Sequence, residues 1–291
     1  MTGKTPPSTL LLRSPGTCDL DPEHLLDAFG RQRQRFVAIL AEFGPDDWAA
    51  PTRCAEWSAH DVVRHLCDAT PALAAGADDR MLDTAAGFNP RKTPREWLAA
   101  SAGEPPAATL ARFVAKTGEA LTLAHDRLAR GETFGVGLPF GSADWTVRTL
   151  HVFWDSWIHE RDVLLARGAE HPTDGDATGY AAAYGMFLAG AVAAMAGDRV
   201  GQSLTLDGDG GGVFDLDISG TVTLTVSRVP VTGQPAGGRP AARVADALAG
   251  RAQTPDVLGD LPDGTRAALT RLADFFDRPS RRARHELAAE R

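Results

Sequence analysis

The chain has 291 residues, of which 43% are hydrophobic and 23% are charged, and its formal net charge is -8. This apolar content supports a folded core and excludes a wholly disordered chain. The excess of 38 acidic over 30 basic residues argues against a nucleic-acid binder and against docking on an anionic membrane, because both need a basic surface. The length is typical of one large domain or of two ordinary ones.

Cysteine usage and the apolar segments favour the cytoplasm. The 3 cysteines are an odd number without CxxC spacing, which disfavours a disulfide framework. The apolar run 10–12 is too short for the core of a signal peptide. The stretch 181–197 is near the lower length limit of a membrane span, but its Ala and Gly content favours a buried helix. We therefore expect a soluble, cytoplasmic protein that does not associate with membranes.

The N-terminal third predicts a tail and two helices. Residues 1–18 are rich in Pro, Thr, Ser and Gly, and predict a flexible tail. The aspartate–proline pair at 21–22 predicts the start of a first helix, whose apolar residues recur at helical spacing until Gly44. Ser58 and Asp61 have the spacing of a capping box, which predicts the start of a second helix.

The middle of the chain predicts two further helices. Segment 75–105 is rich in Gly and Pro and predicts irregular structure. A third helix is predicted from the prolines at 105–106 to Gly131, followed by a loop over 131–141. A fourth, long helix is predicted over 142–168, capped by its first serine and ended by its last glycine.

The fold class follows from these elements and from a change in the sequence pattern near residue 171. Four helices with one long connection predict an antiparallel four-helix bundle over 19–170. Beyond it, a small α+β domain is predicted over 171–278, and a charged tail over 279–291. The elements of this second domain are a small-residue helix (177–197), strands with a Gly-rich hairpin turn (203–206, 213–218 and 221–229), and two short helices (242–250 and 265–277).

Histidines and carboxylates on the second and fourth helices predict a metal site. Asp155 and His159 are four residues apart, so both lie on one face of the fourth helix. His65, in mid-helix among apolar residues, is the candidate third ligand. Two histidines and one carboxylate leave coordination positions open, as in catalytic sites, and favour Zn²⁺ over Fe²⁺ or Ni²⁺. Asp61 and Asp162 are predicted to orient the two imidazoles.

Simpler interpretations of the same residues exist. An Asp–His pair at this spacing also occurs as an ordinary helix pair, so spacing alone does not favour a metal site. Cys54 is either a fourth ligand or a thiol nucleophile, and without a base beside it we interpret it as an inert cysteine. Trp57, Trp154 and Trp157 are interpreted as core and helix-contact residues.

Three segments resemble motifs of one family. PTRCAEWSAHDVVRHL (51–66) resembles the signature P-T-x-C-x-x-W-S/T-x-x-D-L/V-x-x-H-L/V of the mycothiol-dependent maleylpyruvate isomerase-like family, in the DinB-like superfamily. HVFWDSWIHERDVLLARG (151–168) resembles the second motif, D/E-x-x-x-H-x-x-D-L/V-x-x-A-x-G. ADALAGRAQTPDVLGDL (245–261) resembles the closing segment of the family. The resemblance covers residues 20–277 and implies a DinB-like metal-binding four-helix bundle, followed by a sterol-carrier-protein-like α+β domain.

The resemblance also implies a site and a chemistry. By position, His65, Asp155 and His159 match the metal triad, although the isomerase has Glu where Asp155 stands, which weakens maleylpyruvate as the substrate. The implied enzyme holds the sulfur of mycothiol on a divalent metal as the nucleophilic thiolate. Addition to an activated cis double bond, followed by rotation and elimination, gives a cis–trans isomerase, whereas an adduct that persists gives a thiol S-transferase. Arg251 is a candidate anchor for a substrate carboxylate, with a surface arginine as the simpler interpretation.

Two other functions stay open at this stage. One is a specialised biosynthetic enzyme of the same fold that uses another thiol or none. The other is a non-catalytic module that binds a metal or another ligand. The expected partners are a small-molecule substrate and a thiol cosubstrate, in a monomer or small homo-oligomer without nucleic acid. Segments 75–105 and 131–141 are expected to line the entrance to the substrate site.

Overall fold

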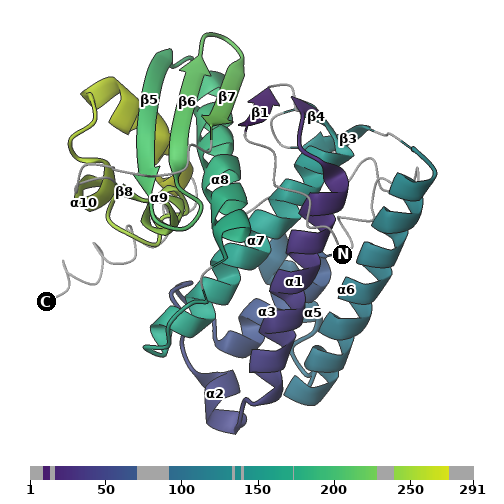
Figure 1. The fold of residues 1–291 in the computed structure, drawn as a ribbon. Helices are drawn as coiled ribbons and strands as arrows, with labels where there is room; N and C mark the ends of the chain where they lie inside the picture. The colour runs from purple at the N-terminus through teal and green to yellow at the C-terminus, as the bar shows by residue number, and fades with distance from the viewer. Residues whose placement is uncertain are drawn as a thin grey trace, which may run out of the picture.

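Four helices pack against one another, and two of them contain the predicted ligands (Figure 1 shows the four helices). They are α1 (Pro22–Ala41), α3 (Ala59–Ala69), α6 (Pro106–Ala129) and α7 (Trp145–Ala166). The sequence predicts a helix at each of these places, and all four predictions are confirmed. The structure is a computed structural model and describes residues 9–13, 17–70, 92–132, 135–138, 141–172, 174–227 and 239–274.

The predicted capping signals operate at two of these helices. Asp21 caps α1 by accepting a hydrogen bond from the backbone N–H of Glu23. Ser58 and Asp61 form the predicted capping box of α3. The start of α7 differs from the prediction, because the residues around the predicted cap, Ser142, pair in a hairpin of β3 (Gly135–Leu138) and β4 (Gly141–Asp144).

Three short helices were not predicted: α2 (Pro45–Ala49), α5 (Thr93–Ala100) and α10 (Thr254–Leu258). Each has a proline at its first or second position. Proline at a helix start costs nothing, because the N–H that it lacks has no partner within the helix there. The prediction of irregular structure over 75–105 is therefore wrong for α5, while residues 71–91 lie outside the described part of the chain.

A six-stranded sheet forms the second part of the molecule, in the order β2-β1-β7-β6-β5-β8. Its centre is formed by the three predicted strands, which pair antiparallel, and the predicted hairpin turn joins the first two. The strands are β1 (Thr9–Arg13), β2 (Thr17–Cys18), β5 (Val200–Asp207), β6 (Gly212–Ile218), β7 (Val222–Ser227) and β8 (Arg239–Pro240).

The prediction of a flexible tail over 1–18 is wrong for residues 9–13 and 17–18, which form β1 and β2. β1 pairs antiparallel with β7, and its side chains Leu10 and Leu12 are buried, as alternation along a strand requires. Three leucines between polar residues are too few to show strand periodicity, and their partner strand lies far away in the sequence. The start of the chain therefore completes the sheet of the predicted second domain.

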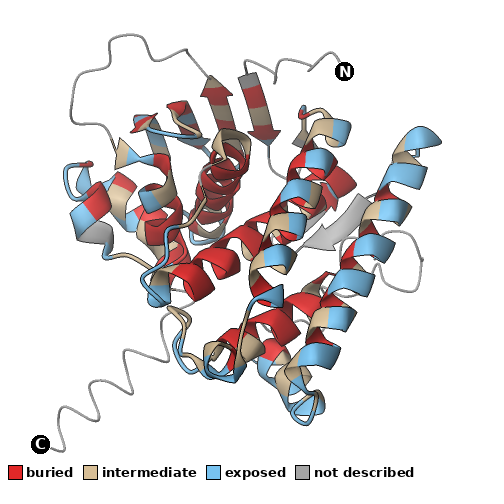
Figure 2. Cartoon of the chain, turned by 60° about the horizontal axis from the view of Figure 1, so that its bottom comes forward, coloured by how far each residue is buried: buried red, intermediate tan, exposed pale blue. Residues whose placement is uncertain are grey.

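Helix α8 (Gly175–Met195) lies between the four packed helices and the sheet, and contacts α7, β6, β7 and α9 (Ala241–Leu248). A Cβ added at its Gly190 would lie 2.9 Å from a methyl group of Val222, so the glycine permits close approach to the sheet. Among the described residues, α8 alone has the length and composition of a membrane span. However, 83% of its most apolar window is buried inside the protein, so the prediction of a buried helix is confirmed (Figure 2).

One hydrophobic core runs through both parts of the molecule. It contains residues of α1, α7, α8, the sheet and the helical segment 263–274, including Phe29, Trp157, Tyr180 and Phe214. A second core cluster, with Phe36, Val62 and Phe113 among its members, lies among the four helices. The fold therefore combines helices and a sheet, as predicted, but the two parts do not have a core each, because the larger cluster contains residues of both.

Candidate metal centre

The three predicted ligands meet between α3 and α7. His65 Nε2 lies 3.3 Å from Asp155 Oδ2, and His159 Nε2 lies 3.5 Å from Asp155 Oδ1. One ligand atom of each residue lies within 4.8 Å of the other two. Ligand atoms about 2.0–2.2 Å from a tetrahedral Zn²⁺ ion are separated by roughly 3.3–3.6 Å. The donor set and its spacing therefore fit a single divalent metal ion.

Two tryptophans cover the histidines. Trp57 stacks on His159 with 5.8 Å between ring centroids, and its ring centroid lies 5.0 Å from that of His65. Trp97 of α5 stacks on the other histidine, His65, at 6.3 Å. His65 and His159 are 7% and 6% exposed, so the aromatic rings limit access of water to them. Trp57, interpreted from the sequence as a core residue, is thus a wall of the candidate centre.

Asp162 lies where the sequence predicts it, beside His159. His159 Nδ1 is 3.1 Å from Asp162 Oδ2, and the carboxylate is buried. An ionised carboxylate can only accept hydrogen bonds, so Nδ1 carries the proton. The lone pair of the neutral ring then lies on Nε2, which faces Asp155. Asp162 therefore selects the tautomer that can bind a metal.

The predicted contact of Asp61 with His65 is wrong. The Asp61 carboxylate accepts hydrogen bonds from the backbone N–H of Ser58 at 2.9 Å, from its hydroxyl at 2.7 Å, and from Arg64. Side chains in a helix point toward its N-terminus, so Asp61 turns to the cap and away from His65. Within the described residues, His65 Nδ1 is buried and has no hydrogen-bond partner.

Arg251 reaches the centre through Asp162. Its Nε lies 3.1 Å from each oxygen of Asp162, and its Nη1 donates to the carbonyl of Ala249 at 2.9 Å. Arg53 Nε is 3.3 Å from the same carboxylate. The structure thus places Arg251 as a partner of the carboxylate that orients His159, and a contact with substrate stays a prediction.

A second ion-pair group, which the sequence did not reveal, joins α9 to the helices. Asp246 accepts hydrogen bonds from Arg53 Nη2 and from Arg161 Nη2, both at 2.6 Å. Arg53 therefore contacts both Asp246 and Asp162. The three partners come from a loop, α7 and α9, and no local spacing in the sequence could indicate that they meet.

Both carboxylates next to His159 are ionised at neutral pH. Burial alone would raise the pKa of Asp155, but the neighbouring His65 and His159 outweigh it and hold that pKa well below its ordinary value. Burial likewise opposes ionisation of Asp162, yet the Arg251 guanidinium and His159 lower its pKa strongly. The centre therefore offers a negative ligand and a negative orienting group.

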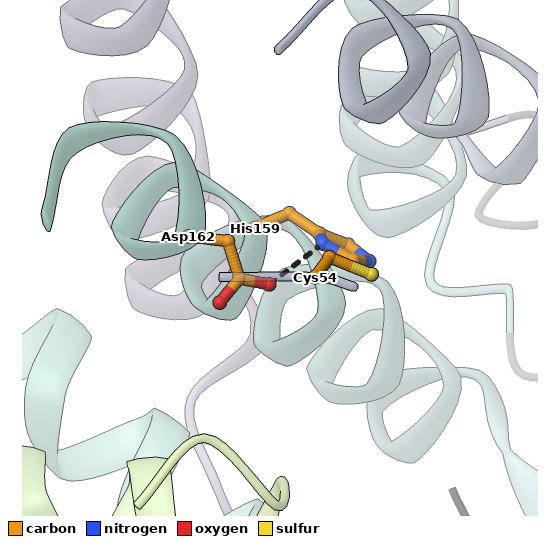
Figure 3. A group of neighbouring side chains, drawn as sticks. All are labelled: Cys54, His159 and Asp162. Atoms are coloured by element: carbon orange, nitrogen blue, oxygen red, sulfur yellow. Dashed lines mark hydrogen bonds and ion pairs between the residues drawn. The ribbon is translucent and has the colours of Figure 1, made fainter. Parts of the chain in front are cut away.

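Cys54 is the neighbour that the sequence analysis set aside. Cys54, His159 and Asp162 form a second group whose candidate ligand atoms all lie within 4.8 Å of one another (Figure 3). Burial raises the pKa of the Cys54 thiol to about 12. Without a metal the side chain is therefore a neutral thiol.

The Asp162→Asn variant tests the orienting role. We expect metal affinity to fall about 10–100-fold, because an amide no longer fixes the His159 proton on Nδ1. The measurement is zinc affinity by competition with a chromophoric chelator. The control is Asp198→Asn, which removes an ion pair with Arg271 on the surface and should leave the affinity unchanged. Equal zinc affinities for wild type and Asp162→Asn would refute the orienting role.

The chain is similar to known proteins in one domain and in overall fold. Residues 29–164, which include His65, Asp155 and His159, match the family described as "Mycothiol maleylpyruvate isomerase N-terminal domain". A crystal structure of a histidine-to-alanine mutant of the mycothiol-dependent maleylpyruvate isomerase is similar, with a TM-score of 0.56 and 15% identity, and the likeness covers 80% of this chain and 91% of that chain. At this identity the likeness shows the shared fold alone. A search of curated proteins gives no match. By this match, residues 29–164 of the chain belong to the family of the mycothiol maleylpyruvate isomerase N-terminal domain.

Proposed function

We propose that the protein is a metal-dependent enzyme that uses mycothiol, or a similar low-molecular-weight thiol, on a small electrophilic substrate. The observation that carries the proposal is the convergence of His65, Asp155 and His159, with His159 held by Asp162. Two nitrogens and one carboxylate leave coordination positions open, which is the arrangement of catalytic metal sites. In this proposal the four packed helices are a DinB-like bundle, and the sheet with α8 and α9 is a sterol-carrier-protein-like unit of a cytoplasmic enzyme.

The residues of this chain have distinct tasks in the proposal. His65 and His159 present their Nε2 atoms, and Asp155 supplies the negative ligand. The Asp155 side chain is 22% exposed, more than either histidine side chain, so it is the ligand most accessible to solvent. Trp57 and Trp97 shield the histidines from water. When bound, Zn²⁺ and the thiol together supply a nucleophilic sulfur at neutral pH, for reversible addition to a double bond or for lasting attachment to an electrophile.

Two reactions are compatible with such a sulfur. Reversible addition to a maleyl-type substrate isomerises a cis double bond, and the family match favours this reaction. Lasting attachment gives an S-conjugate, and the shorter carboxylate of Asp155 in place of the glutamate of the isomerase keeps this outcome open. Both reactions require the thiol and the three ligands. They differ in the product, so one series of assays that identifies the product separates them.

The test is turnover by the zinc-loaded protein. With mycothiol and maleylpyruvate we expect the trans isomer to form, and no product when the thiol is omitted. A panel of electrophiles is assayed in parallel by mass spectrometry for S-conjugates of mycothiol. Elemental analysis is expected to give about one divalent metal ion per chain. Metal-loaded protein that yields neither the trans isomer nor any conjugate would point to a non-catalytic binding module.

A further inference from the structure

A buried arginine among the four packed helices has no polar partner. Arg33 of α1 is 0% exposed, and within the described part of the chain its Nε, Nη1 and Nη2 atoms make no hydrogen bond. Its Cζ atom lies 4.9 Å from the centroid of the Phe29 ring and 4.6 Å from that of the Phe113 ring. Aromatic faces attract a cation, but they do not replace the hydrogen bonds that its N–H groups make in water. The guanidinium can therefore still donate to an acceptor.

The side chain keeps its positive charge at neutral pH. Burial lowers the pKa of Arg33 to about 10, although the charge of Asp155 and, less strongly, that of Glu160 oppose this shift. Neither carboxylate pairs with the guanidinium directly. Asp155 faces the two histidines, and Glu160 accepts hydrogen bonds from Arg35. A buried cation without a partner destabilises a fold, so its presence points to an anion that binds there.

A second unpartnered polar group lies at the same level of the helices. Thr117 of α6 is 8% exposed, and among the described residues its Oγ1 is buried without a hydrogen-bond partner. It follows Phe113 by one turn on the buried face of α6. Contacts between α1 and α6 lie on either side of this level: Gly30 with Leu121, and Phe36 with Phe113. Arg33 and Thr117 stand midway between these two contacts, so the two groups lie at one level.

The metal ligand Asp155 belongs to the same level. Contacts between α1 and α7 lie on either side of it: Phe29 with Phe153, and Gln32 with Ser156. The charge of Asp155 acts on Arg33, as the pKa of the arginine shows. Two unpartnered polar side chains are therefore buried beside the candidate metal centre, one from α1 and one from α6.

We propose that Arg33, assisted by the hydroxyl of Thr117, binds a carboxylate of the electrophilic substrate beside the metal centre. The inference rests on the proposed function and narrows it to electrophiles that carry a carboxylate. A guanidinium can donate two parallel hydrogen bonds to a carboxylate, and a hydroxyl can add another. Ligand sites of helix bundles are built in this way, from side chains of facing helices. The positive charges of a divalent ion and of Arg33 exceed the negative charge of Asp155, and a thiolate and one carboxylate would balance the difference.

Calorimetric titration of the zinc-loaded full chain with maleate, without thiol, tests the proposal. Maleate is a dicarboxylate that stands in for a maleyl-type substrate, and its neutral diamide is the control ligand. We expect Arg33→Met to bind maleate about 10–100-fold more weakly than wild type, because hydrogen bonds to a charged group are lost. Arg33→Lys should fall between the two, since it keeps the charge and loses the paired geometry. Binding of the diamide should be weak and the same in all three proteins.

Two further variants separate the site from its surroundings. Thr117→Val should weaken maleate binding by about 2–10-fold, because it removes one neutral donor. The matched control is Arg31→Met, which removes an arginine of the same helix whose side chain is 50% exposed. It should bind maleate like wild type. All variants should keep their zinc, since none of them replaces a ligand.

Urea denaturation gives an independent result. Arg33→Met replaces an unpaired buried cation by an apolar side chain, so without ligand it should unfold at the same urea concentration as wild type or at a higher one. Maleate should raise the midpoint of wild type and leave that of Arg33→Met nearly unchanged at the same concentration. A lower midpoint of the variant without ligand would count against the proposal, because it would show that Arg33 is already compensated in the free protein.

The outcomes distinguish this inference from the proposed function. Equal affinities of wild type and Arg33→Met for maleate, or no binding to wild type, would overturn the carboxylate site and leave the turnover test standing. Binding of maleate that depends on Arg33, without any turnover, would support the carboxylate site and count against the proposed function.

Discussion

Replacing His159 by alanine is expected to lower the bound metal from about one ion per chain to none. The substitution removes one of the two ligands on α7 and leaves His65 on α3 and Asp155 on α7. It also removes the partner of Asp162 within the centre. Thiol-dependent turnover should fall below detection. The measurements are elemental analysis of the purified variant and the turnover assay.

The control for this variant is His125→Ala, which removes an exposed histidine of α6 and should keep a full metal complement. His65→Ala should behave like His159→Ala, since it also leaves two ligands. Circular dichroism of all three variants checks that the helices remain folded. If His159→Ala kept stoichiometric metal at the wild-type affinity, the ligand assignment would be wrong.

The Asp246→Ala variant is expected to lose about 3–5 kcal/mol of unfolding free energy. Asp246 is 4% exposed and receives hydrogen bonds from both Arg53 and Arg161. Without the carboxylate, the Arg161 guanidinium stays buried against the Trp157 ring with its charge uncompensated. Arg53 retains Asp162, so the greater part of the loss comes from Arg161. Urea denaturation followed by circular dichroism measures the change.

A matched exposed pair provides the control. Asp263 pairs with Arg266, and its side chain is 93% exposed. Such pairs contribute about 0–1 kcal/mol, so Asp263→Ala should be close to wild type. Similar losses of unfolding free energy in Asp246→Ala and Asp263→Ala would show that the burial of Asp246 does not increase its contribution to stability.

The unfolding free energy at acidic pH provides a second test of the Asp246→Ala prediction. Burial raises the pKa of Asp246, but hydrogen bonds from Arg161 and Arg53 outweigh it, and the net shift is downward. A carboxyl whose pKa is lower in the folded state stabilises the fold above its unfolded pKa of about 3.9 and loses this contribution as the pH falls through the folded value. The difference in stability between wild type and Asp246→Ala should therefore shrink as the pH falls below about 4.

The sequence predicted those parts of the fold that local signals determine. An acceptor side chain at a cap and apolar residues at helical spacing sufficed for α1 and α3. Pro94 lies in the segment predicted to be irregular, although it stands in the first turn of α5, and the prolines at 45 and 255 were not recognised as helix starts. Proline ends one helix and begins another with equal ease, so the residue alone does not decide which of the two it does.

The candidate site was predictable where its contacts lie within one helix, because helical spacing determines them. Helical spacing placed Asp155 and His159 on one face, and the position of Asp162 three residues later predicted its contact with His159. The contacts of Arg53 and Cys54 depend on how the loop 51–58 folds onto α7, which no periodicity records. The predicted contact of Asp61 with His65 was wrong. The Asp61 carboxylate already accepts hydrogen bonds at the helix cap, so it cannot also bind a residue one turn further on.

The pairing of β1 with β7 determines when the molecule can finish folding. Thr9 lies opposite Ser227, so the strands that meet are separated by 227 - 9 = 218 residues. Contacts of such long sequence separation form slowly, because a long loop must be closed before the strand pair can form. During synthesis the leucines of β1 emerge before β7 and cannot pair with it until β7 has left the ribosome. Until then this apolar segment has no partner strand within the chain and can pair with another molecule.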